Sequence, residues 1–423
     1  MSDSQQAHSD RAATVSVPRC WLWVWTALLA APWVLLAVTL GPQWVRQTAQ
    51  NWRIGKYHRE DAIRRCRPGP WGELEYTRIV IEPPEQFIAL PFDPDKKVRW
   101  VLHGYTPERL GQLWAEAKLG VTEQQTLMAS ARWENGIGTV VLEPPRELIF
   151  NLSPTARARI YQALSEFSEN HLQVYPFRFR ADQVDEWFRD SDTSERTEKL
   201  IRQMLYQRGT AVLFSDLDTL LPMLETARER SRALKTLSRI STLLLKLRVR
   251  PNTDLDTVAR YWGRGRRSKD IAPLLGSLPK RPEGYTIDAA HLLPSFARRR
   301  LYTYPDPDTD PDALRRDCHW TSMNFFNEVP DDRFLSHENT REVIMRDYYP
   351  VLGDPLFGDL IFLMRPNAEA VHSCVYVADN IVFTKNGPQP YVPWTLMELS
   401  DVRATYSTTD PSIEMRVFRY KHW

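Results

Sequence analysis

The sequence predicts an α+β protein that a single N-terminal helix anchors in a membrane. Three features of the 423-residue chain indicate this fold class. An uncharged apolar run lies near the start, helical and strand-like segments alternate through the middle, and a helix followed by a β-hairpin pattern ends the chain. Hydrophobic residues make up 43% of the chain and charged residues 26%, which is typical of a folded globular protein and excludes a disordered one.

Charge and cysteine content exclude further classes. The 55 Lys and Arg residues nearly balance the 53 Asp and Glu residues, and a formal net charge of +2 produces no field that attracts a polyanion. We therefore expect no nucleic-acid partner. Four cysteines in so long a chain do not make a disulfide framework, so any catalytic thiol must be identified by its neighbours.

The run from residue 20 to residue 45 contains no charged residue and is long enough for a transmembrane helix. Trp21, Trp23 and Trp25 lie at one end and Trp44 at the other, and indole rings prefer the membrane interface. A cleaved secretory signal is the alternative. Because the run is longer than a typical signal core and lacks a small-x-small cleavage site, we predict an uncleaved anchor.

The charges that flank the predicted anchor do not determine on which side of the membrane the C-terminal part lies. Six Lys and Arg residues between Arg46 and Arg65 place the C-terminal part in the cytosol if the positive-inside rule is counted directly. Long domains, however, cross membranes despite flanking charge.

Two composition breaks divide the rest of the chain. Pro68-Gly69-Pro70 ends a predicted juxtamembrane helix. The alternating Pro and Asp residues of 302–312 cannot bury an apolar face and predict a linker. The predicted segments are a polar tail (1–19), the anchor (20–45), the juxtamembrane helix (46–67), a mixed α+β domain of unknown role (68–301), the linker (302–312) and a C-terminal domain (313–423).

Within segment 68–301, five short apolar runs predict strands, which begin at Tyr76, Val98, Thr139, Glu147 and Ala211. The run around Leu243 fits either a strand or a buried helix, because periodicity does not separate the two.

Capping signals predict the helices of the same segment. Thr106-Pro107 and Ser153-Pro154 each read as an N-cap followed by proline at the first helical position. A third helix is expected to run to Gly209 as its C-terminal glycine. Residues 217–240 are largely helical, and their interleaved basic and acidic residues favour a solvated face over a nucleic-acid surface.

The C-terminal segment carries a candidate nucleophile. CHWTSMNFFNEV reads as a helix that begins at Cys318, with Asp317 as its cap. A thiol in the first turn lies near the positive end of the helix dipole, which favours the thiolate, and the same N–H groups are suited to an oxyanion.

A candidate base follows in a hairpin. FGDLIFL from Phe357 predicts a strand entered through a Gly-Asp turn, and VHSCVYVADNIVFTKNG predicts two strands that turn near Asp379-Asn380. His372 lies on the first of these strands, and a rigid strand suits a base that must meet a thiol on a separate helix.

These residues resemble the NlpC/P60 superfamily of papain-like cysteine hydrolases over about the last quarter of the chain. The matching motifs, in family order, are Asp317-Cys318, Gly358-Asp359-Leu360 and His372…Tyr376…Asp379. The resemblance implies a papain-like α+β domain, in which a helix packs on an antiparallel sheet, and hydrolysis of a peptide or amide. It also implies no cofactor, peptidoglycan stem peptides as the leading substrate class, and a C-terminal domain outside the cytoplasm.

The chain departs from the family at two places. His319-Trp320 replaces the Ser-Gly that usually follows the cysteine. The third polar residue of the family corresponds to Thr384, and Asn386 lies two residues further, on the same face of a regular strand. We predict Asn386 as the residue that orients the imidazole, with Thr384 next, whereas Lys385 faces the site only if the hairpin slips by one residue.

The sequence therefore predicts a membrane-anchored cysteine hydrolase with Cys318 as nucleophile, His372 as base and Asn386 as orienting residue. The competing hypothesis is a catalytically inactive, membrane-tethered interaction protein, and a third is a hydrolase that faces the cytosol. Core packing is favoured for Cys374, and His319 is a less favoured base because a helical neighbour points away. We expect no metal site, because neither Cys-x-x-Cys nor His-x-x-x-His spacing accompanies these residues. The oligomeric state stays open.

Overall fold

A computed structural model of the chain describes residues 63–88, 92–134, 138–278, 281–306, 312, 315–389, 391–407 and 412–423. The predicted anchor, 20–45, and most of the predicted juxtamembrane helix lie outside these ranges. Within them, no helix is both long and apolar enough to cross a membrane. The end of the juxtamembrane prediction is wrong, because Arg64–Arg65 forms a short strand, β1, that pairs with β2.

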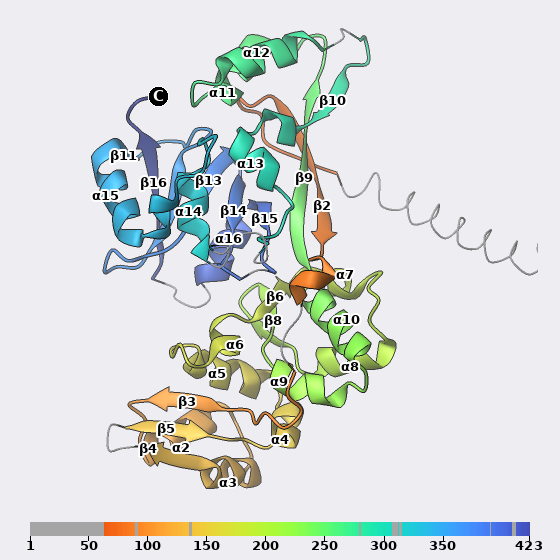
Figure 1. The fold of residues 1–423 in the computed structure, drawn as a ribbon, viewed down its shortest axis with the longest axis vertical. Coiled ribbons are helices and arrows are strands. Elements are labelled where there is room, and N and C mark those ends of the chain that lie inside the picture. Colours follow the sequence, from red (N-terminus) through yellow and green to blue (C-terminus); the bar gives the residue numbers. More distant parts are fainter. Residues whose placement is uncertain are drawn as a thin grey trace, which may run out of the picture. The chain divides into compact units, whose positions relative to one another are not determined.

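The architecture is α+β, as predicted, with four antiparallel sheets among the described residues. In the first sheet, β2 (Glu73–Ile81) and β9 (Ile240–Val249) lie side by side along their whole length (Figure 1). Its order is β1-β2-β9-β10, with β10 at Tyr285–Asp288. The ambiguous run around Leu243 is therefore a strand. Alternate residues of it are buried against the core, namely Leu243, Leu245, Leu247 and Val249.

A six-stranded sheet contains two of the three C-terminal motifs, the Gly358-Asp359-Leu360 motif and the one that begins at His372. Its order is β11 (Tyr348–Val351), β16 (Glu414–Tyr420), β12 (Leu360–Met364), β13 (Ala370–Ala378), β14 (Ile381–Lys385) and β15 (Trp394–Glu398). The predicted hairpin is confirmed, and it turns at Asp379, whose φ of 49° is the left-handed conformation of a tight turn. The predicted Gly-Asp entry is also present, with Gly358 at φ 87°.

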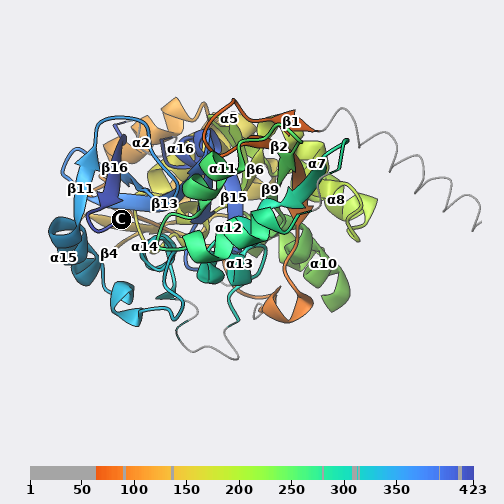
Figure 2. The ribbon, with the colours of Figure 1, turned by 90° about the horizontal axis from the view of Figure 1, so that it is seen from above.

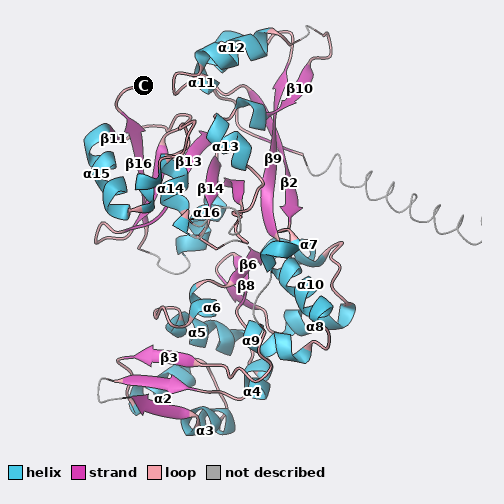
Figure 3. Ribbon diagram, viewed as in Figure 1, coloured by secondary structure: helices cyan, strands magenta, loops and turns pink. Residues whose placement is uncertain are grey.

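Helices cover both faces of this sheet. Helix α14 (Cys318–Met323) packs on β13 and β14, and Figures 2 and 3 both show it beside β13. Its Trp320 shares a core with Val375 and Phe383. Helix α16 (Leu399–Ser407) lies on the opposite face, where Val402 shares a second core with Cys374. The two faces of β13 therefore serve different helices.

Between β2 and β9 the chain forms two smaller sheets with their own helices. Their strands are β3 (Trp100–His103), β4 (Ala131–Glu134) and β5 (Thr139–Leu142) in one, and β6 (Phe177–Arg180), β7 (Tyr206–Arg208) and β8 (Ala211–Phe214) in the other. The helices in this part are α2 (Pro107–Glu116), α3 (Val121–Ala129), α4 (Arg146–Asn151), α5 (Pro154–Leu164), α6 (His171–Val174), α7 (Val184–Phe188), α8 (Glu195–Gln203), α9 (Leu217–Leu220) and α10 (Ala227–Leu237). This part has two apolar cores, one of which includes residues of both sheets, such as Val140 and Leu213. Both ends of this part meet at the Ile81–Ile240 pair, where β2 and β9 come together.

Four helices complete the described part: α11 (Leu255–Trp262), α12 (Ser268–Gly276), α13 (Ser295–Arg300) and α15 (His337–Asp347). One core has members on both sides of the predicted linker, since Leu74 and Leu243 belong to it together with Phe383.

Two element predictions are wrong. The run from Glu147 is helix α4 and not a strand, because a six-residue run with four apolar residues fits either state and Pro145 precedes it as the N-cap. The helix expected to reach Gly209 ends at Gln203. The residues that follow form β7, and Gly209, at φ 59°, lies in the β7–β8 turn. The caps at Thr106 and Ser153 are confirmed, because each side chain accepts a hydrogen bond from the helix's first turn.

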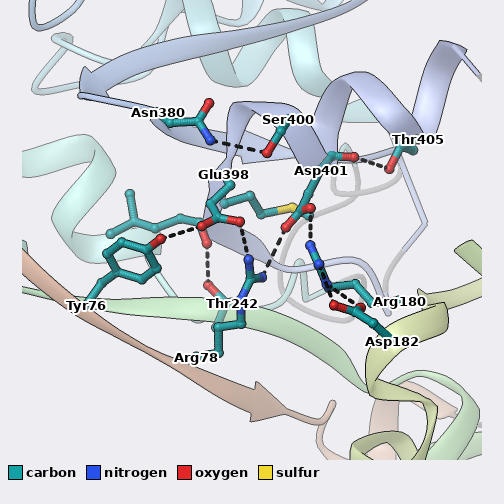
Figure 4. A network of polar contacts seen from close by, with 12 residues as sticks. Tyr76, Arg78, Arg180, Asp182, Thr242, Asn380, Glu398, Ser400, Asp401 and Thr405 are labelled. Carbon is teal, nitrogen blue, oxygen red and sulfur yellow. Dashed lines mark hydrogen bonds and ion pairs between the residues drawn. The ribbon is translucent and has the colours of Figure 1, made fainter. Parts of the chain in front are cut away.

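A polar network joins α16 to the first sheet and to β6 (Figure 4). Arg78 on β2 contacts both Glu398 and Asp401, and Arg180 on β6 contacts the other oxygen of Asp401. Asp401 therefore bridges two arginines from separate sheets. The side chains involved are mostly buried, so these ion pairs are screened less than surface pairs.

Candidate active site

The first turn of α14 positions Cys318. The Asp317 side chain accepts a hydrogen bond of 2.9 Å from the Trp320 N–H, which confirms the predicted cap. Cys318 is buried, with 7% of its surface exposed, and that surface faces a cavity. The nucleophile candidate is thus held rigidly and is reachable from one side only.

The thiol of Cys318 is not the dipole-stabilised thiolate that its position predicts. Burial raises its pKa to about 12, and the negative charge of Asp317 acts in the same direction. Backbone N–H groups of Ser373, Cys318 and His319 favour the thiolate but do not outweigh these effects. The prediction neglected desolvation, which penalises the charged form of any group withdrawn from water. The thiol is protonated at neutral pH and needs a base to become a nucleophile.

Ser373 fastens this turn to β13. Its hydroxyl oxygen lies 3.2 Å from the Cys318 carbonyl oxygen, 3.1 Å from Ser322 Oγ and 3.0 Å from Nδ1 of His319. His319 is therefore a buried structural residue, whose ring also stacks on Phe362. Burial lowers the pKa of His319 and keeps it neutral. The alternative in which His319 acts as the base has no support in these contacts.

His372, Thr384 and Asn386 are linked in that order by hydrogen bonds. His372 Nε2 lies 3.0 Å from the Thr384 hydroxyl, and that hydroxyl donates to Asn386 Oδ1 at 3.1 Å. Asn386 Nδ2 donates to Met397 Sδ at 3.0 Å, and because a thioether only accepts, this contact fixes the orientation of the amide. Thr384 is thus the direct partner of the imidazole, and Asn386 acts one step further out, the reverse of the predicted ranking.

This chain of contacts sets the tautomer of His372. The single hydroxyl proton of Thr384 is given to Asn386, so the hydroxyl can only accept from the imidazole. The ring proton is therefore on Nε2, and Nδ1 carries a free lone pair. Nδ1 is buried and has no hydrogen-bond partner among the described residues. Burial holds the pKa of His372 well below its usual value, so the ring is neutral.

Cys318 and His372 approach the same part of β13 from opposite faces. The ring of His372 lies on the α16 side, stacked on Tyr406 with centroids 4.4 Å apart. Cys318 arrives with α14, yet its sulfur is reached by the backbone N–H of Ser373, the next residue after His372. Because Nδ1 is buried without a partner among the described residues, the imidazole makes no hydrogen bond to the thiol of Cys318.

Two further residues belong to this site. Lys385 is fully buried on β14, and its Nζ donates to the Gly387 carbonyl. Burial lowers its pKa to about 7, while the negative charge of Asp317, and that of Cys318 when it is a thiolate, acts against that shift. Tyr406 is half-buried and stacks on His372; burial raises its pKa, and a thiolate at Cys318 would raise it further. We expected Lys385 to face the site only if the hairpin slipped by one residue, but it lies on the opposite face of β14 from Thr384 without a slip, and Cys318 acts on it there.

Cys374 packs in the core on the α16 face, as favoured from the sequence. Burial raises its pKa, so it stays a protonated thiol.

The cavity beside Cys318 has a volume of about 730 Å³. Its lining comes from the six-stranded sheet on one side and from β6, β7 and β9 on the other. Asn386, Met397 and Tyr406 line it together with Cys318. His372 is fully buried behind this lining, so a substrate that enters meets the sulfur before it meets the imidazole.

Among the described residues, no group of three or more His, Cys, Asp and Glu side chains is arranged to hold a metal ion. Comparison with protein-family models finds no match, and comparisons with curated proteins and with solved structures find none either.

Proposed function

We propose that this chain is a cysteine hydrolase of amide or ester bonds, with Cys318 as nucleophile and His372 as general base. The observation that supports it most is the free Nδ1 lone pair of a neutral, oriented imidazole, on the residue before Ser373, whose hydroxyl contacts the Cys318 carbonyl. Thr384 and Asn386 orient that imidazole. A base is needed here because the raised pKa of Cys318 keeps the thiol protonated.

The reaction begins with proton transfer from the Cys318 thiol to His372 Nδ1 as the sulfur attacks the substrate carbonyl. The carbonyl oxygen becomes an oxyanion, for which the backbone N–H groups at the start of α14 are the nearest donors. The protonated imidazole then gives its proton to the leaving amine or alcohol, which departs and leaves a thioester on Cys318. Water, deprotonated by Nδ1, attacks the thioester and releases the acid and the thiol. Such contacts are often long before substrate binds, and this step requires the Cys318 sulfur and His372 Nδ1 to come together in the substrate complex.

Three further parts of the proposal rest on the sequence resemblance: a papain-like C-terminal domain, its location outside the cytoplasm, and peptidoglycan stem peptides as the leading substrate class. The proposed membrane anchor at 20–45 rests on the uncharged apolar run itself.

A second candidate is a tethered interaction protein without catalysis. It is favoured by one observation, namely that the buried thiol and imidazole do not contact each other through a hydrogen bond.

Acylation of the full-length protein separates the two. We expect p-nitrophenyl acetate to leave an acetyl group on Cys318, seen by peptide mass spectrometry, with a burst of p-nitrophenol. Cys318→Ala and His372→Ala should abolish the burst, whereas Cys66→Ala, a matched control at a partly exposed thiol, should keep it. Wild-type protein that shows neither burst nor acetyl-Cys318 would establish the interaction protein instead.

A further inference from the structure

Two arginines in the cavity wall lack an acidic partner. Most of the arginines that line the cavity are paired with carboxylates: Arg78 with Glu398 and Asp401, Arg180 with Asp182 and Asp401, Arg239 with Glu82, Arg315 with Asp312, and Arg365 with Glu369. Arg178 and Arg208 also line the cavity, but no carboxylate in the described part of the chain lies within ion-pair distance of either.

Arg178 reaches the candidate active site from β6. Its Nη1 donates a 2.7 Å hydrogen bond to the carbonyl of Thr405, the residue before Tyr406. Tyr406 in turn stacks on His372. The guanidinium is thus fixed at the edge of the site, two contacts from the proposed base.

Arg208 lies close to Arg178 on the other side of β8. Strand β8 pairs with both β6 and β7, and its Ala211 is opposite Arg180 on one side and Arg208 on the other, so Arg208 lies across β8 from the residue two positions after Arg178. Nη2 of Arg208 is buried and has no hydrogen-bond partner among the described residues. Burial lowers the pKa of Arg178, and the like charge of Arg208 lowers it further. Two neighbouring cations with an unmet donor are costly to withdraw from water unless an anion joins them.

We propose that Arg178 and Arg208 form an anion-binding wall that holds a carboxylate or phosphate group of the substrate while its carbonyl lies at Cys318. Planar guanidinium groups bind both anions through paired N–H donors, which sets orientation as well as charge. The inference rests on the proposed function and narrows its substrates to negatively charged amides or esters. The near-neutral net charge of the chain, +2, gives no indication of this site, because the positive charge of Arg178 and Arg208 is local.

Alkylation of Cys318 tests the wall without requiring hydrolysis. Iodoacetate and iodoacetamide are similar in size and differ by one negative charge. The measured quantity is the ratio of their rates at Cys318 in the full-length protein, divided by the same ratio at Cys66. We expect the double variant Arg178→Gln/Arg208→Gln to lower this ratio about tenfold, the lower end of electrostatic focusing in a cleft. Arg178→Lys keeps the charge and should keep most of the ratio. Arg260→Gln, an exposed residue of α11, should leave it unchanged.

The outcomes distinguish the proposals. A ratio in the double variant equal to that of the wild type overturns the anion wall and leaves the hydrolase intact. Failure of both reagents to modify Cys318, while Cys66 reacts, overturns the hydrolase. Calorimetric titration of the protein with inorganic phosphate and with acetate then tests whether Arg178 and Arg208 bind an anion. Binding by the wild type that the double variant loses supports the anion-binding wall. Equal binding by both proteins, or no binding by either, refutes it. The tighter of the two ions identifies the source of the negative charge.

Discussion

Replacing Thr384 by valine tests the orientation of the imidazole. Valine keeps the shape of threonine and removes the oxygen that accepts from His372 Nε2. Both residues are fully buried, so the Nε2–H loses its acceptor and finds no water in its place. A buried unsatisfied donor costs about 1–3 kcal/mol. The proton then shifts toward Nδ1, where it blocks the transfer from the Cys318 thiol. At about 1.4 kcal/mol per factor of ten, the rate should fall roughly 5- to 150-fold.

The assay is the rate of Cys318 alkylation by iodoacetamide at pH 7, together with ¹⁵N NMR of the His372 ring. Wild-type protein should show a protonated Nε2 and an unprotonated Nδ1, and Thr384→Val should show a mixture. Thr384→Ser keeps the hydroxyl and is the matched control, with a rate near that of the wild type. A wild-type ring protonated on Nδ1, or a folded Thr384→Val protein that reacts as fast as the wild type, would refute the reasoning.

Three further predictions concern stability and pH. Because the folded pKa of Lys385 is lowered to about 7, the unfolded chain binds more protons between that pH and the ordinary lysine pKa, so this residue makes stability rise with pH. Relative to Lys385→Met, the wild type should gain about 2 kcal/mol of unfolding free energy in urea between pH 7 and pH 9, and parallel curves would contradict this. Arg157→Met should cost about 3–5 kcal/mol in the same assay, because it leaves Asp216, 2.8 Å from Arg157 Nε and almost fully buried, without its partner, whereas the double change with Asp216→Asn should recover part of the loss. Ser373→Ala should loosen α14 and increase hydrogen exchange at its first turn, which an unchanged exchange rate at Cys318 would disprove.

Local signals predicted the hairpin and the helix caps well. Alternating residues on either side of Asp379-Asn380 and the cap at Asp317 depend only on neighbouring residues, and the structure confirms both. The strand predicted from Glu147 was wrong because a run of six residues, four of them apolar, does not distinguish strand from helix. The helix expected to reach Gly209 failed because a glycine with positive φ ends helices and turns hairpins equally well.

The polar contacts of His372 were predictable from the sequence, but the electrostatics around Cys318 were not. Strand periodicity placed His372, Thr384 and Asn386 on one face, and the structure joins all three. Which of the two polar residues touches the ring depends on side-chain reach, which spacing does not give. The raised pKa of Cys318 and the buried amine of Lys385 depend on how deeply tertiary packing buries them, and no short stretch of sequence contains that information.

Residues 82–239 form an insertion between the paired residues Ile81 and Ile240. The chain enters and leaves this insertion at one place, where β2 and β9 meet, and the insertion has apolar cores of its own. A short turn in its place would remove Arg178 and Arg208 while leaving α14 with Cys318 and β13 with His372 in the chain. Under the two proposals above, the reactive residues and the anion-binding arginines lie on different pieces of chain, so exchanging the inserted piece would redirect the same thiol toward differently charged molecules.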